Sequence, residues 1–170
     1  MTIRKIITLP DPILRRKSRT VTRFDTELQT LVEDMIETLR EAPGVGLAAP
    51  QVGIPDRLIV VEYPQDDEQE NAPKKLFVVA NPEIKAMSSE TELGIEGCLS
   101  IPGLHGEVER ALSVTVKGLN RHGKPVRIKA NGWMARIFQH EIDHVNGVVF
   151  TDRAQKVWRP APEEPVLDNV

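Results

Sequence analysis

The chain has 170 residues, of which 40% are hydrophobic and 28% charged, and its formal net charge is −3. This composition is ordinary for a soluble globular protein, and the length fits one domain large enough to bury a core without disulfide bonds. The weak negative charge indicates neither a nucleic-acid site nor an anionic membrane as a partner, and no apolar run approaches the length of a membrane span.

The N-terminal part of the chain predicts one amphipathic helix over residues 25–41. Thr26 and Gln29 are expected to form its capping box, and Pro43 with Gly44 ends it. The apolar side chains recur at helical spacing: Leu28, Leu31, Val32, Met35, Ile36 and Leu39.

Two strands are expected after this helix. Residues 57–63 and 76–80 are rich in β-branched and aromatic side chains, and Asn81 with Pro82 is expected to close the second strand. Between them, residues 64–75 are polar and acidic, which predicts a surface loop.

The C-terminal part predicts a β-hairpin and a second helix. Residues 106–130 alternate apolar and polar side chains around a turn at 120–123. The helix is expected to open at Asn131 or Gly132 and to stop at Asn146 and Gly147. Residues 154–170 hold prolines and acids, which predicts a disordered or extended tail.

The second helix carries the pattern His140-Glu141-Ile142-Asp143-His144. Two histidines four residues apart lie on one face of a helix, where both imidazoles can bind a single metal ion. The glutamate after the first histidine cannot join them and is placed to take a proton from a metal-bound water. The alternative is a surface helix with two solvated histidines.

A catalytic metal held by two histidines needs a third protein ligand. Cys98 is the candidate, because His105 and His122 lie in polar, turn-like contexts. A lone cysteine is more often a buried core residue, but Gly97 and Gly103 predict a tight segment with exposed backbone here. A single cysteine also excludes an internal disulfide, which fits a reducing cytoplasm.

A third segment, residues 44–51, is rich in small side chains and follows the first helix directly. It fits a turn that ends the helix. It also fits a loop whose backbone comes close to a ligand, with the Gln51 amide as a donor.

In this order, G-V-G-L-A-A-P-Q (44–51), E-G-C-L-S (96–100) and Q-H-E-I-D-H (139–144) resemble the three signature motifs of the peptide deformylases. The resemblance implies an α+β fold in which mixed or antiparallel strands wrap around a central metal-binding helix, with an additional N-terminal helix. It also implies a single catalytic domain over residues 1–153, followed by the tail.

The resemblance implies hydrolysis of the N-formyl group from the N-terminal formylmethionine of nascent polypeptides, which releases formate. It assigns Cys98, His140 and His144 as ligands of one divalent metal ion, with water in the open fourth position. Fe(II) is the expected ion in vivo, and Zn(II), Ni(II) or Co(II) also suit these ligands. N-formylmethionyl peptides, nascent chains and the ribosome are the implied partners, in a bacterial-type cytoplasm.

The same resemblance assigns the remaining catalytic roles. Glu141 is the general base. The Gln51 side-chain amide and the Leu99 backbone N–H stabilise the oxyanion. Glu96 is expected to pair with Arg110 and to support the site rather than take part in the chemistry.

The expected substrate-binding residues surround the methionine. The substrate backbone pairs, strand-like, with main-chain groups of Val45 and Gly97. The Arg136 stem packs against the methionine side chain, while its charged head reaches solvent or an acid. The full set is Gly44, Val45, Gly46, Gly97, Trp133, Arg136 and Ile137.

Two other functions remain open. One is a metal-dependent peptidase of the H-E-x-x-H type that acts on unformylated peptides, although such peptidases lack a thiolate ligand by resemblance. The other is a non-catalytic structural metal site, which would have four protein ligands, and the sequence offers no evident fourth.

Overall fold

The computed structural model describes residues 1–42, 44–64 and 71–162. In chain order its elements are η1 (Pro12–Arg15), α1 (Thr26–Glu41), β1 (Gly46–Ala48), η2 (Ala49–Val52), β2 (Leu58–Pro64), β3 (Lys74–Met87), β4 (Thr91–Cys98), β5 (Ile101–Ala111), β6 (Ser113–Leu119), β7 (Pro125–Asn131), α2 (Gly132–Val145), α3 (Phe150–Arg153) and β8 (Lys156–Trp158).

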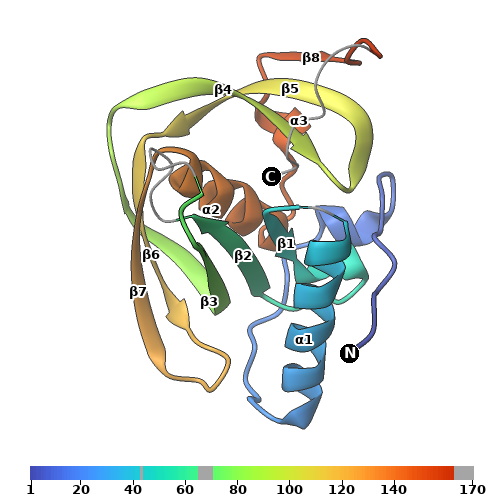
Figure 1. Ribbon diagram of the computed structural model, residues 1–170, viewed down its shortest axis with the longest axis vertical. Helices are drawn as coiled ribbons and strands as arrows, with labels where there is room; N and C mark the ends of the chain where they lie inside the picture. The colour runs from blue at the N-terminus through green and yellow to red at the C-terminus, as the bar shows by residue number, and fades with distance from the viewer. Residues whose placement is uncertain (43, 65–70, 163–170) are drawn as a thin grey trace.

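The strands form two sheets that curve around α2 (Figure 1). The larger sheet has the order β1-β2-β3-β6-β7, and the smaller has the order β4-β5-β8. Every described pairing between these strands is antiparallel. Of the two strand arrangements that were expected, mixed or antiparallel, the described sheets show the antiparallel one, around a central helix.

Strand β2 is buried on both faces, which places a helix on each side of it. Leu58 and Val60 belong to the core beneath α1, whereas Ile59 and Val61 belong to the core around α2. Side chains alternate between the two faces of a strand. The continuous apolar run of this segment therefore fills two separate cores.

Helix α1 begins with a cap that differs from the expected one. The Asp25 side chain accepts a hydrogen bond from the Leu28 backbone N–H at 3.1 Å, so Asp25 is the N-cap residue and the predicted Thr26–Gln29 capping box is wrong. Aspartate is a strong N-cap because its carboxylate satisfies a free N–H at the positive end of the helix. The apolar stripe of α1 packs on the sheet as predicted.

Helix α2 runs through the middle of the molecule (Figure 1). All residues from 134 to 145 are buried, including its charged and histidine side chains. The alternative of a surface helix with solvated histidines is therefore excluded. Within the described part of the chain, no helix combines the length and apolar character needed to cross a membrane.

Strand β3 does not stop at Asn81 and Pro82 as predicted. It pairs with β2 up to Ala80, shifts register, and continues to Met87 along β6. Asn81 has a φ of 53° and exchanges two hydrogen bonds with the Val21 backbone, of 2.8 and 3.0 Å. The Asn-Pro pair thus marks a bulge inside a long strand, where the partner strand changes.

One other segment differs from the sequence prediction, and the tail adds a strand to the smaller sheet. Residues 106–111 belong to β5 and pair with β4, so only β6 and β7 form the predicted hairpin. The tail contributes β8, whose Val157 pairs with Gly106. Residues 65–70 of the expected surface loop and 163–170 of the tail lie outside the described residues.

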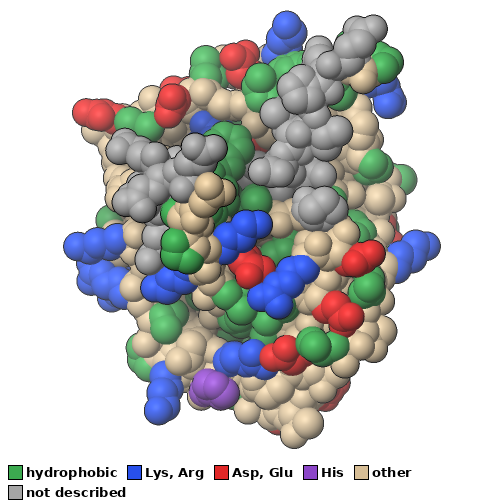
Figure 2. Space-filling model, viewed as in Figure 1, with side chains coloured by type: hydrophobic (Ala, Val, Ile, Leu, Met, Phe, Trp, Pro, Cys, Tyr) green, Lys and Arg blue, Asp and Glu red, His purple; other side chains and the backbone are tan. Residues whose placement is uncertain are grey.

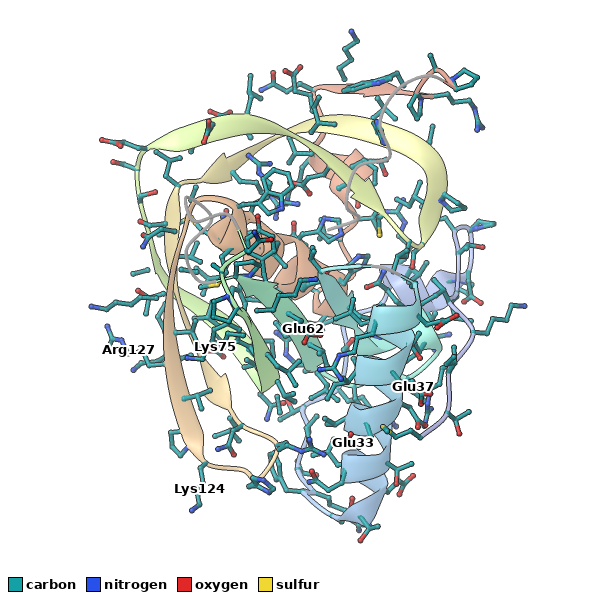
Figure 3. The ribbon with its side chains drawn as sticks, viewed as in Figure 1. Glu33, Glu37, Glu62, Lys75, Lys124 and Arg127 are labelled. Atoms are coloured by element: carbon teal, nitrogen blue, oxygen red, sulfur yellow. The ribbon has the colours of Figure 1, made fainter. Side chains whose placement is uncertain are left out.

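Several exposed cations lie on the strand side of the molecule, and several acids lie along α1. Figure 3 shows Lys75, Lys124 and Arg127 on the side of β3 and the β6–β7 hairpin, while Glu33 and Glu37 lie along α1. Lys and Arg side chains gather on the hairpin side of the face drawn in Figure 2. Because β7 is an edge strand, exposed cations there oppose pairing with another chain.

Candidate active site

Three side chains of metal-ligand type meet between β4 and α2. The ligand atoms of Cys98, His140 and His144 all lie within 4.8 Å of one another, and Cys98 Sγ is 3.4 Å from His144 Nε2. Each of the three residues is 1% exposed. Cys98 is the buried last residue of β4, so the prediction of an exposed segment around it is wrong: the strand carries the thiol into the core.

The orientation of His140 leaves one ring nitrogen for a ligand. Its Nδ1 lies 2.8 Å from Glu96 Oε1. Glu96 is the carboxylate of a buried ion pair and only accepts, so Nδ1 carries the proton and Nε2 is the bare nitrogen. That Nε2 is buried and has no hydrogen-bond partner among the described residues. A thiol, two imidazoles and an orphaned nitrogen within this distance fit a divalent metal ion.

The electrostatics of the cluster favour a bound cation. Burial, followed by the nearby Glu141 carboxylate, raises the pKa of the Cys98 thiol to about 12. Burial lowers the pKa of His144 well below its usual value, which favours the neutral imidazole that can bind metal. A metal ion supplies the positive charge that a buried thiolate needs.

Glu141 follows His140 in the chain and lies near this cluster. It is 0% exposed, and neither carboxylate oxygen has a hydrogen bond within the described residues. Burial, followed by the charge of Glu96, raises the pKa of Glu141 well above its usual value. A buried carboxyl group with a raised pKa holds a proton readily, as a general base must.

Gly46 of β1 is the neighbour that makes room for this carboxylate. A Cβ atom at position 46 would lie 2.8 Å from both Cγ and Oε1 of Glu141. Such a distance is a severe overlap, so glycine is required for Glu141 to pack here. Gly46, expected only to let the substrate backbone approach, therefore also makes room for Glu141.

Gln51 and Leu99 lie next to the cysteine. The Gln51 Oε1 accepts from the Ala48 N–H at 3.0 Å, which turns its Nε2 toward Ser100 Oγ at 3.1 Å and Cys98 Sγ at 3.6 Å. Leu99 is in the turn that follows β4. Buried Ser100, which the sequence reasoning missed, thus orients the Gln51 amide from that same turn.

The expected substrate-binding residues occupy three places. Val45 and Ile137 are buried in the same apolar cluster, with half-buried Trp133 packed against it. The Val45 carbonyl accepts from the Glu62 N–H at 2.9 Å, which anchors this segment to β2. Gly97 is buried beside Cys98 in β4, and Gly44 lies between α1 and β1.

Arg136 has its charged head against an acid, which is one of the two positions expected for it. It is 5% exposed, and its Nη1 donates to Glu96 Oε2 at 2.7 Å. Arg110 donates to both oxygens of Glu96, each at 2.9 Å, so the expected Glu96–Arg110 pair is present. Although burial opposes ionisation, bonds from Arg110 and His140 hold the pKa of Glu96 far below its usual value.

Asp143, inside the H-E-x-x-H segment, extends this network and was missed by the sequence reasoning. Its Oδ2 accepts from Arg110 Nη1 at 2.7 Å and from Arg153 Nε at 2.7 Å. The signal in the sequence was a second acid on a helix with an apolar face, because a buried carboxylate requires a cationic partner. The network ties α2 to β5 and α3.

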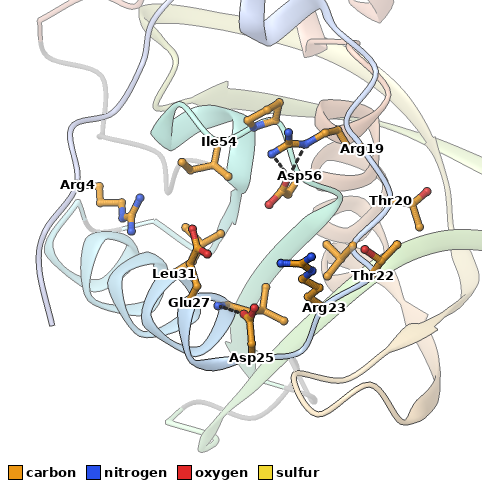
Figure 4. A pocket seen from close by; sticks show the side chains of 13 residues that line it. Arg4, Arg19, Thr20, Thr22, Arg23, Asp25, Glu27, Leu31, Ile54 and Asp56 are labelled. Atoms are coloured by element: carbon orange, nitrogen blue, oxygen red, sulfur yellow. Dashed lines mark hydrogen bonds and ion pairs between the residues drawn. The ribbon is translucent and has the colours of Figure 1, made fainter.

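A cavity of about 550 Å³ beside α1 is separate from this cluster (Figure 4). It is lined by the segment 19–23, the first half of α1 and residues 54–56. Arg4 and Arg19, which face it, already pair with Asp34 and Asp56. The buried cluster, rather than this cavity, has the chemistry of a catalytic site.

Comparison with known proteins agrees with this geometry. The sequence model of the polypeptide deformylase family matches residues 3–159. The chain belongs to this family. Its members remove the N-formyl group from nascent polypeptides, and the chain is accordingly a metal-dependent hydrolase. The resemblance inferred from the three motifs is confirmed.

The chain is similar to several named deformylases. It is 47% identical over 159 residues to the peptide deformylase of Natranaerobius thermophilus, covering 94% of this chain and 97% of that protein. It is 47% identical to that of Thermomicrobium roseum over 166 residues, covering 96% and 94%.

Solved structures show the same fold. The peptide deformylase of Legionella pneumophila is 45% identical, with a TM-score of 0.81 and coverage of 91% of this chain and 87% of that one. That of Ehrlichia chaffeensis in complex with actinonin is 39% identical, with a TM-score of 0.85 and coverage of 92% and 91%. The α+β fold is therefore confirmed.

Proposed function

We propose that this chain hydrolyses the N-formyl amide of an N-terminal formylmethionine, with Cys98, His140 and His144 holding one divalent metal ion and Glu141 as the general base. The observation that carries the proposal is a buried carboxylate, without a hydrogen-bond partner among the described residues, that follows His140 in the chain and acts electrostatically on Cys98 of the buried Cys/His/His cluster. When bound, the ion supplies a Lewis acid that polarises the formyl carbonyl and makes water more acidic.

Glu141 moves the proton in the proposed reaction. It takes a proton from the water that attacks the formyl carbon, and then gives it to the amine nitrogen as the C–N bond breaks. The products are formate and a free N-terminal amine. Its pKa, which burial raises well above the usual value, supports both transfers, because the carboxyl group holds a proton more readily than an exposed glutamate.

The oxyanion donors in this proposal are Gln51 and Leu99. The bond from the Ala48 N–H fixes the Gln51 amide so that its Nε2 faces the cysteine. The Leu99 N–H follows the same cysteine in the chain. A donor held in place before the reaction stabilises developing charge without reorganisation.

The substrate is proposed to lie between β1 and the end of β4. Main-chain groups of Val45 and Gly97 pair with its backbone, and Gly44 and Gly46 leave the approach open. Trp133 and Ile137 form the apolar surface for the methionine side chain. Because the substrates are nascent chains, the ribosome is a proposed partner and the cytoplasm the proposed compartment.

The two alternatives are less well supported. The family to which the chain belongs acts on formylated peptides, so a general peptidase is not favoured. A closed structural metal site has four protein ligands, whereas the group found within the described residues has three.

The test of this function compares two substrates and one variant. A formyl-Met tripeptide should be hydrolysed and its acetylated twin left intact. Glu141→Gln should keep the metal content of the wild type and lose turnover by a factor of at least about 10². Cleavage of an internal peptide bond, or loss of metal from Glu141→Gln, would contradict the assignment.

Fe(II) is the ion we propose for the native enzyme, with Zn(II), Ni(II) or Co(II) as working substitutes. Thiolate and imidazole ligands suit all four ions. Fe(II) is the most readily oxidised of them, so the iron form should lose activity in air while the nickel form persists. Activity is followed against time for each metal form, with and without catalase. Equal lifetimes would favour zinc as the native ion.

A further inference from the structure

The Arg136 side chain is buried, and its guanidinium is held by three hydrogen-bond acceptors. Its Nη1 donates to Glu96 Oε2 at 2.7 Å and to the Val108 carbonyl at 2.9 Å, and its Nη2 donates to the Glu92 carbonyl at 2.8 Å. The centre of the Trp133 ring lies 5.5 Å from its Cζ. A buried guanidinium is costly unless its donors are satisfied, and three acceptors hold this one in a single orientation.

Glu96 is the shared acceptor through which Arg136 reaches the metal cluster. The carboxylate is 0% exposed and accepts from Arg110 on both oxygens, from Arg136 on Oε2 and from His140 Nδ1 on Oε1. The arginines come from β5 and α2, so they restrain Glu96 from two directions. The Glu96 oxygen in turn sets the ring orientation of His140 and leaves its Nε2 as the acceptor.

Gly94 provides the space for the Arg136 guanidinium. A Cβ atom at position 94 would lie 2.6 Å from Cζ of Arg136, 2.8 Å from Nη2 and 2.9 Å from Nε. The guanidinium cannot move aside without losing its bonds to the Glu92 and Val108 carbonyls. Gly94 is the β4 residue that pairs with Val108 of β5. The register of β4 and β5 therefore fixes the position of the space that the guanidinium occupies.

We propose that Arg136 is a positioning residue for the metal site: it holds Glu96 and, through Glu96, the ring of His140, and Gly94 is the residue that admits it. The inference rests on the proposed function, in which His140 is a metal ligand. It adds to the expectation that the Arg136 stem lines the methionine pocket, because the guanidinium contacts Glu96 and the Glu92 carbonyl of β4.

The experiment measures metal affinity beside activity. Arg136→Leu, Arg136→Lys, Gly94→Ala and the wild type are loaded with Co(II), and Co(II) affinity is measured by competition with a chelator. The visible spectrum of bound Co(II) reports the ligand geometry. Loss of an outer-shell partner typically weakens metal affinity by about 10–100-fold. We expect that loss for Arg136→Leu, with kcat lowered and KM for a formyl-Met peptide little changed.

The other variants separate positioning from packing. Arg136→Lys keeps the charge but not the planar fork, so it should recover part of the affinity. Gly94→Ala should shift the Co(II) spectrum as Arg136→Leu does, and should add nothing when combined with it. Arg40→Leu is the matched control, because Arg40 makes a surface ion pair with Glu62, and its Co(II) affinity should equal that of the wild type.

Three outcomes would overturn an assignment, and each is distinct. Wild-type protein that binds no Co(II) would refute the proposed function itself. Wild-type affinity in both Arg136→Leu and Gly94→Ala would refute the positioning role alone. If Arg136→Leu keeps the wild-type Co(II) affinity but changes the ratio of KM values for methionine and norleucine substrates, Arg136 acts only in the methionine pocket.

Discussion

Glu141 occupies space that any side chain at position 46 would fill. A Cβ atom at position 46 would lie only 2.8 Å from Cγ and from Oε1 of Glu141. Cγ sets the direction of the carboxylate, and Oε1 is one of its two proton-accepting oxygens. Gly46→Ala should therefore turn the carboxylate away and lower kcat by at least about tenfold, while metal content stays at the wild-type level. Steady-state kinetics with a formyl-Met peptide and metal analysis check this prediction.

A double-mutant cycle identifies the cause of that loss. In the Glu141→Gln background the general base is already absent, so Gly46→Ala should produce little further decrease in kcat. An equal decrease in both backgrounds would mean that Gly46 acts through the substrate backbone instead.

At the scale of elements, α1 holds the N-terminal segment of the chain. The Asp34 carboxylate accepts from the Thr2 N–H at 2.8 Å and from Arg4 Nε at 2.9 Å. Burial opposes the ionised form, but the bonds from Thr2 and Arg4 outweigh it and lower the pKa of Asp34. The Thr38 Oγ accepts from the Arg4 N–H at 2.8 Å and forms a second tether that does not titrate.

This pair of tethers gives a pH-dependent prediction. A carboxylate whose pKa is lowered by folding adds stability above its unfolded pKa of about 3.9, and that stability is lost as pH falls through the folded pKa. Asp34→Asn should lower the free energy of unfolding by about 1–2 kcal/mol at pH 7. The difference from wild type should shrink as pH falls below about 4.

Urea titrations at several pH values measure the effect. Thr38→Val serves as the control, because the bond that it removes carries no titratable group, and its cost should be constant across the same range. A cost of Asp34→Asn that stays constant with pH would show that the Asp34 charge contributes nothing.

At the scale of the whole molecule, the proposed metal joins parts of the fold that meet only in space. Cys98 belongs to the smaller sheet, and both histidines belong to the helix that the two sheets enclose. A ligand that binds only the folded state adds about 2.7 kcal/mol to the free energy of unfolding when its free concentration is 100 times its Kd. For a chain of this size that corresponds to a Tm change of about 5–10 °C.

Removal of the metal should therefore lower Tm by that amount. A chelator-treated sample is melted with increasing free Zn(II) or Ni(II), and Tm should rise with the logarithm of the metal concentration. Cys98→Ser should respond weakly, because a neutral hydroxyl is a poor ligand. A Tm that does not depend on free metal in the wild type would contradict a metal site that joins these elements.

Patterns confined to a few residues were readable from the sequence alone. The stripe of α1, the strand β2 and the one-turn spacing of His140 and His144 follow from backbone periodicities, which do not depend on distant parts of the chain. The three motifs were likewise sufficient for the family and for the α+β fold. The central position of the histidine helix was implied by the resemblance to the deformylases and not by a periodicity.

The tertiary structure decided the contacts between residues that are far apart in sequence. The choice of Asp25 over Thr26 as the cap depended on local geometry. Three other features depended on how the sheets close around α2: the burial of Cys98, the course of β3 past Asn81 and the direction of the Arg136 head. Arg136 and Glu96 are separated by 40 residues. No periodicity spans that distance, so only packing decides which acid a buried arginine meets, and Gly94 acquires its role because packing brings that arginine against it.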